Sequence, residues 1–251
     1  MTAAEELLLS LGVDTPQGID LEAIAWCLGA VVRVGRLESC EARIIGYGDK
    51  AIITVDPKHG PARLRFSIGH ELGHWHHHRG RSSICRAEDI GREGQALNHP
   101  ERVADGFAAD LLLPAYLFRP AAARLKRTTF AAVDDLARQF QTSRTATAMR
   151  MVDFGPEPAM IVCHSPTGRR WFKRGSGVPD RWFPREDLDA QSNAFEALHG
   201  GVDRPQPFLI GADAWFDRRE AESYEVYEQT VRGGGGDVLT LLTFKSAAML
   251  D

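Results

Sequence analysis

The residues best suited to chemistry lie in the stretch FSIGHELGHWHHH, from Phe66 to His78, which holds five of the nine histidines. Its HELGH segment places His70 and His74 four residues apart. On an α-helix, residues at that spacing share one face, with roughly 5–6 Å between their Cβ atoms. Both imidazoles can therefore reach one metal ion. The spacing predicts a two-histidine half of a metal site.

Glu71, between the two histidines, suits a different task. It is rotated about 100° around the helix from His70, so it can reach a metal-bound water without being a ligand. A carboxylate there can take a proton from the water and pass it to a leaving amine. The pattern therefore predicts metal-assisted hydrolysis. The alternative is a set of surface or core histidines with no metal.

A catalytic metal site needs a third protein ligand and an open position for water. Glu101, in PERVAD, lies 27 residues after His74 and begins a strongly helical stretch. Asp105 follows one turn later on the same face, where it can accept the second N–H of a ligand histidine. The alternatives are an acid that suits a helix N-terminus for Glu101, and a solvated or capping acid for Asp105.

Other polar residues near this motif are weaker candidates. His77 and His78 could compete for metal, although polar side chains also suit the end of a helix. His99 directly precedes the helix of Glu101, where it can cap the helix. His99 and Tyr116 are weak candidates for stabilising the oxyanion of a transition state.

The predicted elements around these residues define an α+β fold. Two short helices, which end at Gly12 and Gly29, precede three β-branched runs that predict a small antiparallel sheet. A helix from residue 62 to 80 carries HELGH, and its small residues, Ser67, Gly69 and Gly73, could pack on the sheet. After a polar loop over residues 81–99, Pro100 starts a strong helix that Pro114 stops. Residues 1–118 are thus predicted to form a zincin-like metallopeptidase domain.

Residues 119–155 read as a helix-turn-helix-like helical segment, in which QTS joins two short helices and the local charge from Arg119 to Arg150 is +5. Apolar positions on both helices face inward: Leu136, Ala137, Phe140, Ala148, Met149 and Val152. Either DNA contact or packing and docking would suit it. We favour packing and docking, because Arg144 and Arg150 fall on different helix faces. Residues 156–251 are predicted to form a small C-terminal α/β domain with a sensory or docking role.

Bulk properties exclude some classes of protein. The net charge of -4 and the pI of about 6.1 point to neither nucleic acid nor membrane. No apolar run approaches the roughly 20 residues of a membrane span, and the first residues lack the basic start of a secretory signal. The four cysteines form no CxxC pair. This usage predicts a cytoplasmic protein with reduced thiols.

Three segments resemble the ImmA/IrrE family of metallopeptidases: IDLEAIAWCLGAVV, RFSIGHELGHWHHH and ERVADGFAADLLLP. The last is the most specific, because a glutamate followed by FAADLLLP is typical of that family's second active-site helix. The resemblance implies a compact zincin-like domain in a soluble, cytoplasmic protein that cuts one particular helix-turn-helix repressor. By motif position it makes His70, His74 and Glu101 the metal ligands and Glu71 the catalytic acid/base.

The sequence thus predicts a metal-dependent endopeptidase with one divalent metal. Two histidines and one carboxylate suit zinc, although manganese or iron can use similar ligands. The expected substrate is a helix-turn-helix (XRE-type) repressor in a stress or mobile-element response. The alternatives are a DNA-binding regulator or a toxin-antitoxin-type partner with a metal site. Glu71 argues against a purely structural metal, which has no use for a carboxylate at that position.

Overall fold

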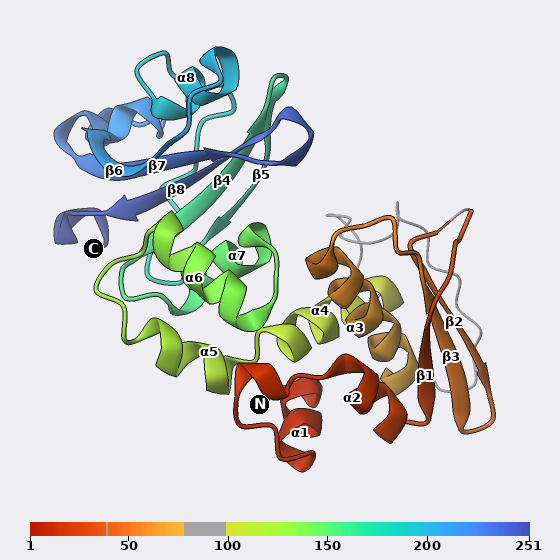
Figure 1. The fold of residues 1–251 in the computed structure, drawn as a ribbon. Helices are drawn as coiled ribbons and strands as arrows, with labels where there is room; N and C mark the ends of the chain where they lie inside the picture. The colour runs from red at the N-terminus through yellow and green to blue at the C-terminus, as the bar shows by residue number, and fades with distance from the viewer. Residues whose placement is uncertain (39, 78–98) are drawn as a thin grey trace. The chain divides into compact units, whose positions relative to one another are not determined.

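The computed structural model describes residues 1–38, 40–77 and 99–251. All but the last residue of the predicted loop at 81–99 lies outside the described residues, as do the predicted helix end at Gly80 and His78. Contacts divide the chain into two compact units, residues 1–118 with 137–143, and residues 119–136 with 144–251. The predicted mixed fold with two sheets is confirmed (Figure 1). The predicted three-part division remains a prediction, and its middle segment is shared between the two units.

The first unit begins with helices α1 (Ala3–Ser10) and α2 (Leu21–Cys27). Thr2 and Glu5 form a reciprocal capping box on α1, and the Asp20 carboxylate accepts two N–H groups of α2. These side chains satisfy amide groups that the first turn of a helix leaves without partners. The two helices therefore begin directly after their capping residues, Thr2 and Asp20.

Three strands follow, β1 (Ala30–Val34), β2 (Ala42–Tyr47) and β3 (Lys50–Val55), in the order β1-β3-β2. The β2–β3 hairpin is antiparallel, as predicted, but β1 pairs with β3 in parallel. The expectation of a wholly antiparallel sheet was therefore wrong for one pair. Strand directions still alternate along the chain, but β1 lies beside the second strand of the hairpin rather than the first.

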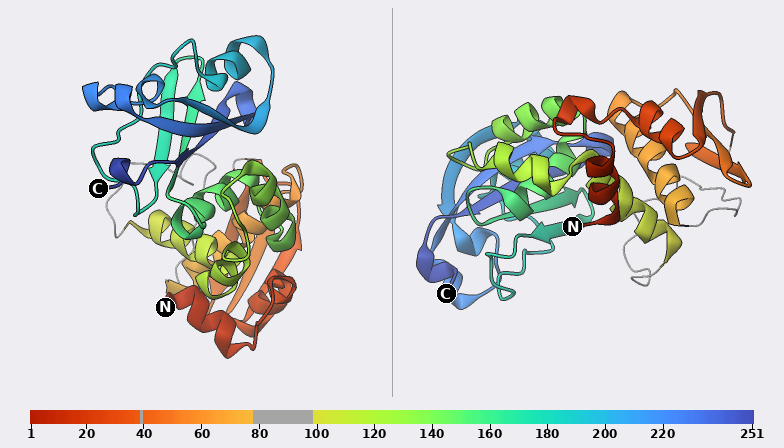
Figure 2. Two further views of the ribbon diagram at one scale, coloured as in Figure 1. Left: turned by 90° about the vertical axis from the view of Figure 1, so that its left-hand side faces the viewer. Right: turned by 90° about the horizontal axis from the view of Figure 1, so that it is seen from below.

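Helix α3 (Pro61–His77) covers one face of this sheet (Figures 1 and 2). Side chains alternate between faces along a strand, and Ile44 and Ile53 are buried on the face toward α3. Trp75 of α3 lies against Gly46, where an added Cβ would come within 2.5 Å of the indole ring. A glycine at position 46 thus lets the helix approach the strand.

Helix α4 (Pro100–Leu112) packs directly on α3 and is followed by α5 (Ala115–Ala122). A Cβ at Gly73 would lie 2.9 Å from the Cα of Ala104, and one at Gly69 would lie 3.3 Å from the Cβ of Ala108. The small residues at 69 and 73 therefore face α4, rather than the sheet as the sequence suggested. They bring the two helix backbones together at the positions that carry the candidate ligands.

The helical segment consists of α6 (Phe130–Phe140) and α7 (Arg144–Phe154). Gln141, which begins the connection, has a φ of +54°, a conformation that glycine usually supplies. Of the predicted inward side chains, four are buried and two half-buried; the buried ones are Leu136, Phe140, Ala148 and Val152. The predicted apolar faces are thus confirmed.

The rest of the second unit is built on one antiparallel sheet of order β5-β4-β8-β7-β6, with one helix between β5 and β6 (Figure 1). Its elements are β4 (Ala159–Ser165), β5 (Gly168–Arg174), α8 (Asn193–Gly200), β6 (Arg204–Gly211), β7 (Glu225–Arg232) and β8 (Val238–Phe244). The glycines at 234–236 connect β7 to β8, as predicted. Gly235 and Gly236 take positive φ angles there.

The core of this unit contains one fully buried carboxylate, Glu228. It accepts hydrogen bonds from the Ala194 N–H at 2.8 Å, the Trp215 indole N–H at 3.2 Å and the Thr230 hydroxyl at 3.1 Å. Burial raises the pKa of Glu228, although these hydrogen bonds partly oppose the rise. Because Ala194 lies in the first turn of α8, Glu228 joins the sheet to the start of that helix.

Candidate metal centre

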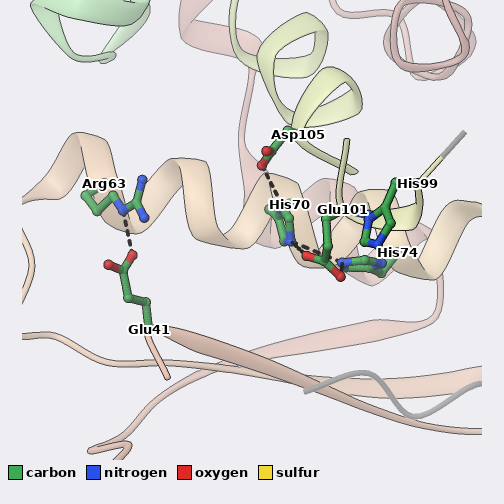
Figure 3. A network of polar contacts seen from close by, with 7 residues as sticks. All are labelled: Glu41, Arg63, His70, His74, His99, Glu101 and Asp105. Atoms are coloured by element: carbon green, nitrogen blue, oxygen red, sulfur yellow. Dashed lines mark hydrogen bonds and ion pairs between the residues drawn. The ribbon is translucent and has the colours of Figure 1, made fainter. Parts of the chain in front are cut away.

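His70 and His74 stand one turn apart on α3, and both are buried. Their Nε2 atoms are 3.1 Å from each other (Figure 3). The arrangement follows from the spacing of four residues, which places both rings on the same helix face. The predicted pairing of these two side chains is therefore present in the structure.

Glu101 reaches the same point from the first turn of α4. One carboxylate oxygen lies 3.2 Å from Nε2 of His70, and the other lies 3.3 Å from Nε2 of His74. Ligand atoms of the three residues all lie within 4.8 Å of one another. Within the described part of the chain, this is the one cluster of histidine, cysteine and acidic side chains with such spacing.

Asp105 lies one turn beyond Glu101 and contacts the opposite nitrogen of His70, with 2.9 Å between Nδ1 and Oδ1. In a neutral ring, Nδ1–H donates to this carboxylate, and Nε2 keeps its lone pair. That lone pair faces an oxygen of Glu101 and Nε2 of His74. Electron-pair donors thus converge on one point, which is the arrangement that a divalent cation satisfies. The residues present therefore fit a metal.

The same convergence perturbs the proton affinities of the cluster. Burial lowers the pKa of His70, but hydrogen bonds with Asp105 and Glu101 outweigh it and raise the pKa to about 9. Burial raises the pKa of Glu101, but contacts with His70 and His74 outweigh that effect and hold it well below its usual range. A proton and a metal ion therefore compete for the same electron pairs.

Glu71 follows His70 on α3, and its side chain is fully buried. It is not a member of the three-residue ligand group among the described residues. Its negative charge contributes to raising the pKa of His70 and also that of the buried Cys40 thiol, where burial is the main cause. Glu71 is thus close enough to act on the cluster electrostatically from outside its ligand set.

His99 is the N-cap of α4, where its Nδ1 accepts the Glu101 N–H at 3.4 Å (Figure 3). The neutral ring then carries its proton on Nε2. The Tyr116 hydroxyl instead donates to the Val13 carbonyl at 2.6 Å, and no contact in the described part of the chain joins Tyr116 to the ligands. Of the two candidate oxyanion donors, only His99 adjoins a ligand.

His76 and His77 end α3 and pack against Phe107 of α4, with ring centroids 5.1 and 5.7 Å away. Neither belongs to the described ligand group. One further contact was not predicted: Arg63, in the first turn of α3, pairs with Glu41 at 2.5 Å (Figure 3). The two residues are 22 positions apart, beyond the reach of helical or strand periodicity.

The arginines considered as base-reading residues have other contacts. Arg144 makes a two-pronged ion pair with Asp134, at 2.7 and 3.0 Å. The Arg150 guanidinium lies 5.1 Å from the ring centroid of Phe154. The first contact ties Arg144 of α7 to α6, and the second lays Arg150 along its own helix. Among the described helices, none has the length and apolarity to cross a membrane.

Comparison with known proteins places this site in a family. Residues 27–152, which are 126 of the 251 residues, match the Peptidase M78 family, described as the IrrE N-terminal-like domain. A solved structure described as a Mycobacterium tuberculosis transcriptional regulator shares the fold, with a TM-score of 0.61 and 17% identity over 98% of this chain and 88% of that one. No curated protein sequence gave a match. The matched region contains all three candidate ligands and Glu71, and the chain belongs to the family of IrrE N-terminal-like domains.

Proposed function

We propose that this protein is a metal-dependent endopeptidase. The observation that carries the proposal is the convergence of His70, His74 and Glu101, with the buried Glu71 one position along the same helix. Membership of a peptidase family supports it. Two imidazoles and one carboxylate form a typical zinc-peptidase ligand set that leaves a position open for water. Zinc fits best, and manganese or iron can use the same donors.

In this proposal each residue has one task. When bound, a divalent metal supplies a Lewis acid that acidifies water and polarises a peptide carbonyl. Glu71 takes the proton of the attacking water and returns it to the leaving amine. Asp105 fixes the tautomer and orientation of His70 through the hydrogen bond to Nδ1. The Nε2–H of His99 is the candidate donor to the developing oxyanion.

For the substrate we propose a helix-turn-helix (XRE-type) repressor in the cytoplasm, cut at one site in a stress or mobile-element response. Two findings support a regulatory substrate. The family bears the name of the IrrE N-terminal domain, and the solved structure with the shared fold is described as a transcriptional regulator. We propose packing and docking, rather than operator reading, for α6 and α7, because Arg144 is paired with Asp134 of α6 and Arg150 lies against Phe154 of its own helix.

The decisive experiment incubates the full-length, zinc-loaded protein with the helix-turn-helix repressor encoded beside its gene, and identifies fragments by mass spectrometry. We expect one cut, which a chelator abolishes and added zinc restores. The Glu71→Gln variant should bind the repressor and leave it intact. Equal cleavage by the Glu71→Gln variant would contradict the role of Glu71 as the general base. An intact repressor after incubation with the metal-loaded wild type would refute this substrate.

A further inference from the structure

The sheet of the first unit has a second face that α3 does not cover. Side chains on this face are apolar and exposed to an unusual degree: Tyr47 is 92% exposed, Ile45 50%, Val31 39% and Ile52 38%. Trp26, from the last turn of α2, adds an indole that is 73% exposed. A sheet face that remains in water is normally polar. A contiguous apolar patch marks a surface that another molecule covers.

Strand register arranges these side chains in rows. Val31, Ile52 and Ile45 lie side by side across β1, β3 and β2. Two residues along, toward the β2–β3 turn, Tyr47 pairs with Lys50. Together with Trp26, Gly29, Arg33 and Ala51, they line a trough of about 610 Å³. We call this surface, defined by all nine lining residues, the outer trough.

Basic side chains border the outer trough at both ends. Arg33 and Arg43 flank Thr54 in the row on one side of the aliphatic row, and Lys50 lies on the other side. The lining residues include two cations and no acid. Among the described residues, neither Arg33 nor Lys50 is within ion-pair distance of a carboxylate, whereas Arg63 of the same unit is paired with Glu41. The charge that complements this surface is therefore negative.

We propose that the outer trough docks an amphipathic helix of another protein, with an apolar stripe flanked by Asp or Glu residues. Three rows spaced two residues apart span about 14 Å, which a helix of about nine residues covers at 1.5 Å per residue. A helix is also the element that completes a sheet layer, as α3 does on the opposite face. The surface is distinct from the metal cluster, so the proposal does not depend on peptidase activity.

The test uses two synthetic 14-residue helical peptides with the same leucine stripe, one flanked by glutamates and the other by lysines. Binding to the full-length, metal-free protein is followed through the δ1-methyl resonances of Ile45 and Ile52. We expect the glutamate peptide to shift both resonances and to bind at least about tenfold more tightly than the lysine peptide. The proposal would be overturned if the two peptides bound with equal affinity, or if binding shifted neither the Ile45 nor the Ile52 methyl resonance.

The Arg33→Glu/Lys50→Glu double variant should reverse the preference between the peptides. The matched control is Arg219→Glu/Lys245→Glu, which reverses two exposed cations of the second unit and should leave the preference unchanged. Sedimentation and a single-stranded DNA oligonucleotide test the other occupants. If the protein is a dimer that the Tyr47→Ser substitution dissociates, the occupant is a second copy of the chain. If DNA displaces the glutamate peptide, the occupant is DNA. Either result would contradict an acidic helix. The same fold-change in both double variants would also contradict it.

Discussion

Each unit of this protein holds a buried or half-buried carboxylate in a dense polar cluster, and the two clusters differ in what surrounds the oxygens. Glu228 in the second unit accepts hydrogen bonds from neutral donors, the Ala194 N–H, the Trp215 N–H and the Thr230 hydroxyl. Glu101 in the first unit faces the Nε2 atoms of His70 and His74. The pKa is raised at Glu228 and lowered at Glu101.

The difference separates a structural carboxylate from a ligand. Neutral donors supply hydrogen bonds to the Glu228 carboxylate, which thereby joins α8 to the sheet. Burial still disfavours the charged form of Glu228. Around Glu101, the nearest groups are imidazole nitrogens. Nδ1–H of His70 faces Asp105, so Nε2 of His70 can donate to Glu101 only after the ring takes up a proton. A cluster whose members all offer electron pairs is complete only with a cation, either protons or a metal.

The largest effect should follow removal of a ligand. His70→Ala, His74→Ala and Glu101→Ala should each lose the single bound metal, because two protein donors hold a divalent ion far less firmly than three. Metal analysis of purified full-length protein measures this loss. Glu228→Gln is the matched control, since it alters the other carboxylate and should keep one metal per chain. Full metal occupancy in all three ligand variants would contradict the assigned site.

Glu71→Gln should keep the metal and lose about 10²- to 10⁴-fold in kcat/KM, because the amide preserves shape and removes the base. Cleavage of the repressor and metal content are measured on the same preparation. Loss of metal together with activity would instead place Glu71 among the ligands. A native rate in this variant would remove it from the mechanism.

Asp105→Ala should weaken metal affinity by about 10- to 100-fold, because the variant loses the hydrogen bond that fixes the His70 tautomer. A competition titration with a chromophoric chelator gives the affinity. Asp105→Asn separates charge from geometry, since its amide oxygen can still accept from Nδ1–H. Unchanged metal affinity in Asp105→Ala would show that the 2.9 Å contact between Asp105 and His70 does not position the ligand.

The metal-free protein should lose stability as the pH rises through about 9. The pKa of His70 is raised above its ordinary 6.5, so its contribution is fully present below pH 6.5 and disappears as the proton leaves. The low pKa of Glu101 acts in the other direction, with a contribution present above pH 4.5 and lost in acid. Thermal unfolding at pH 6 and pH 10 measures the change, which His70→Ala should reduce. An equal change in that variant would assign it to other groups.

The smallest effect is expected at the end of α3. His77→Ala should retain metal and activity, because His77 is exposed, contacts Phe107 and does not belong to the described ligand group. Metal content and repressor cleavage within about twofold of wild type would agree with variation at an ordinary surface position. A large loss of metal would make the terminal histidines a second binding site.

The features that sequence predicts here are local ones. The pairing of His70 with His74, and the placement of Glu101 and Asp105 one turn apart, follow from helical geometry within a few residues. Glu101 was assigned to the histidine pair by its motif, whereas other contacts between distant segments could not be predicted from periodicity. The parallel pairing of β1 with β3 depends on which hairpin strand lies beside β1, and the Tyr116 hydroxyl finds Val13 across 103 positions. The small residues Gly69 and Gly73 indicated that another element packs closely on α3. Periodicity alone did not reveal whether that element is the sheet or a helix.

The contact at Gly73 has a consequence for how this protein tolerates substitution. There, α3 and α4 meet backbone to backbone, since an added Cβ would lie 2.9 Å from the Cα of Ala104. Helices separated by bulky side chains shift when those side chains change, whereas helices in direct contact are held by their main chains. Substitutions in the surrounding core therefore change the distance between the two ligand-bearing helices little. Sequences of this kind can diverge widely around the two helices while the spacing of their ligands stays constant.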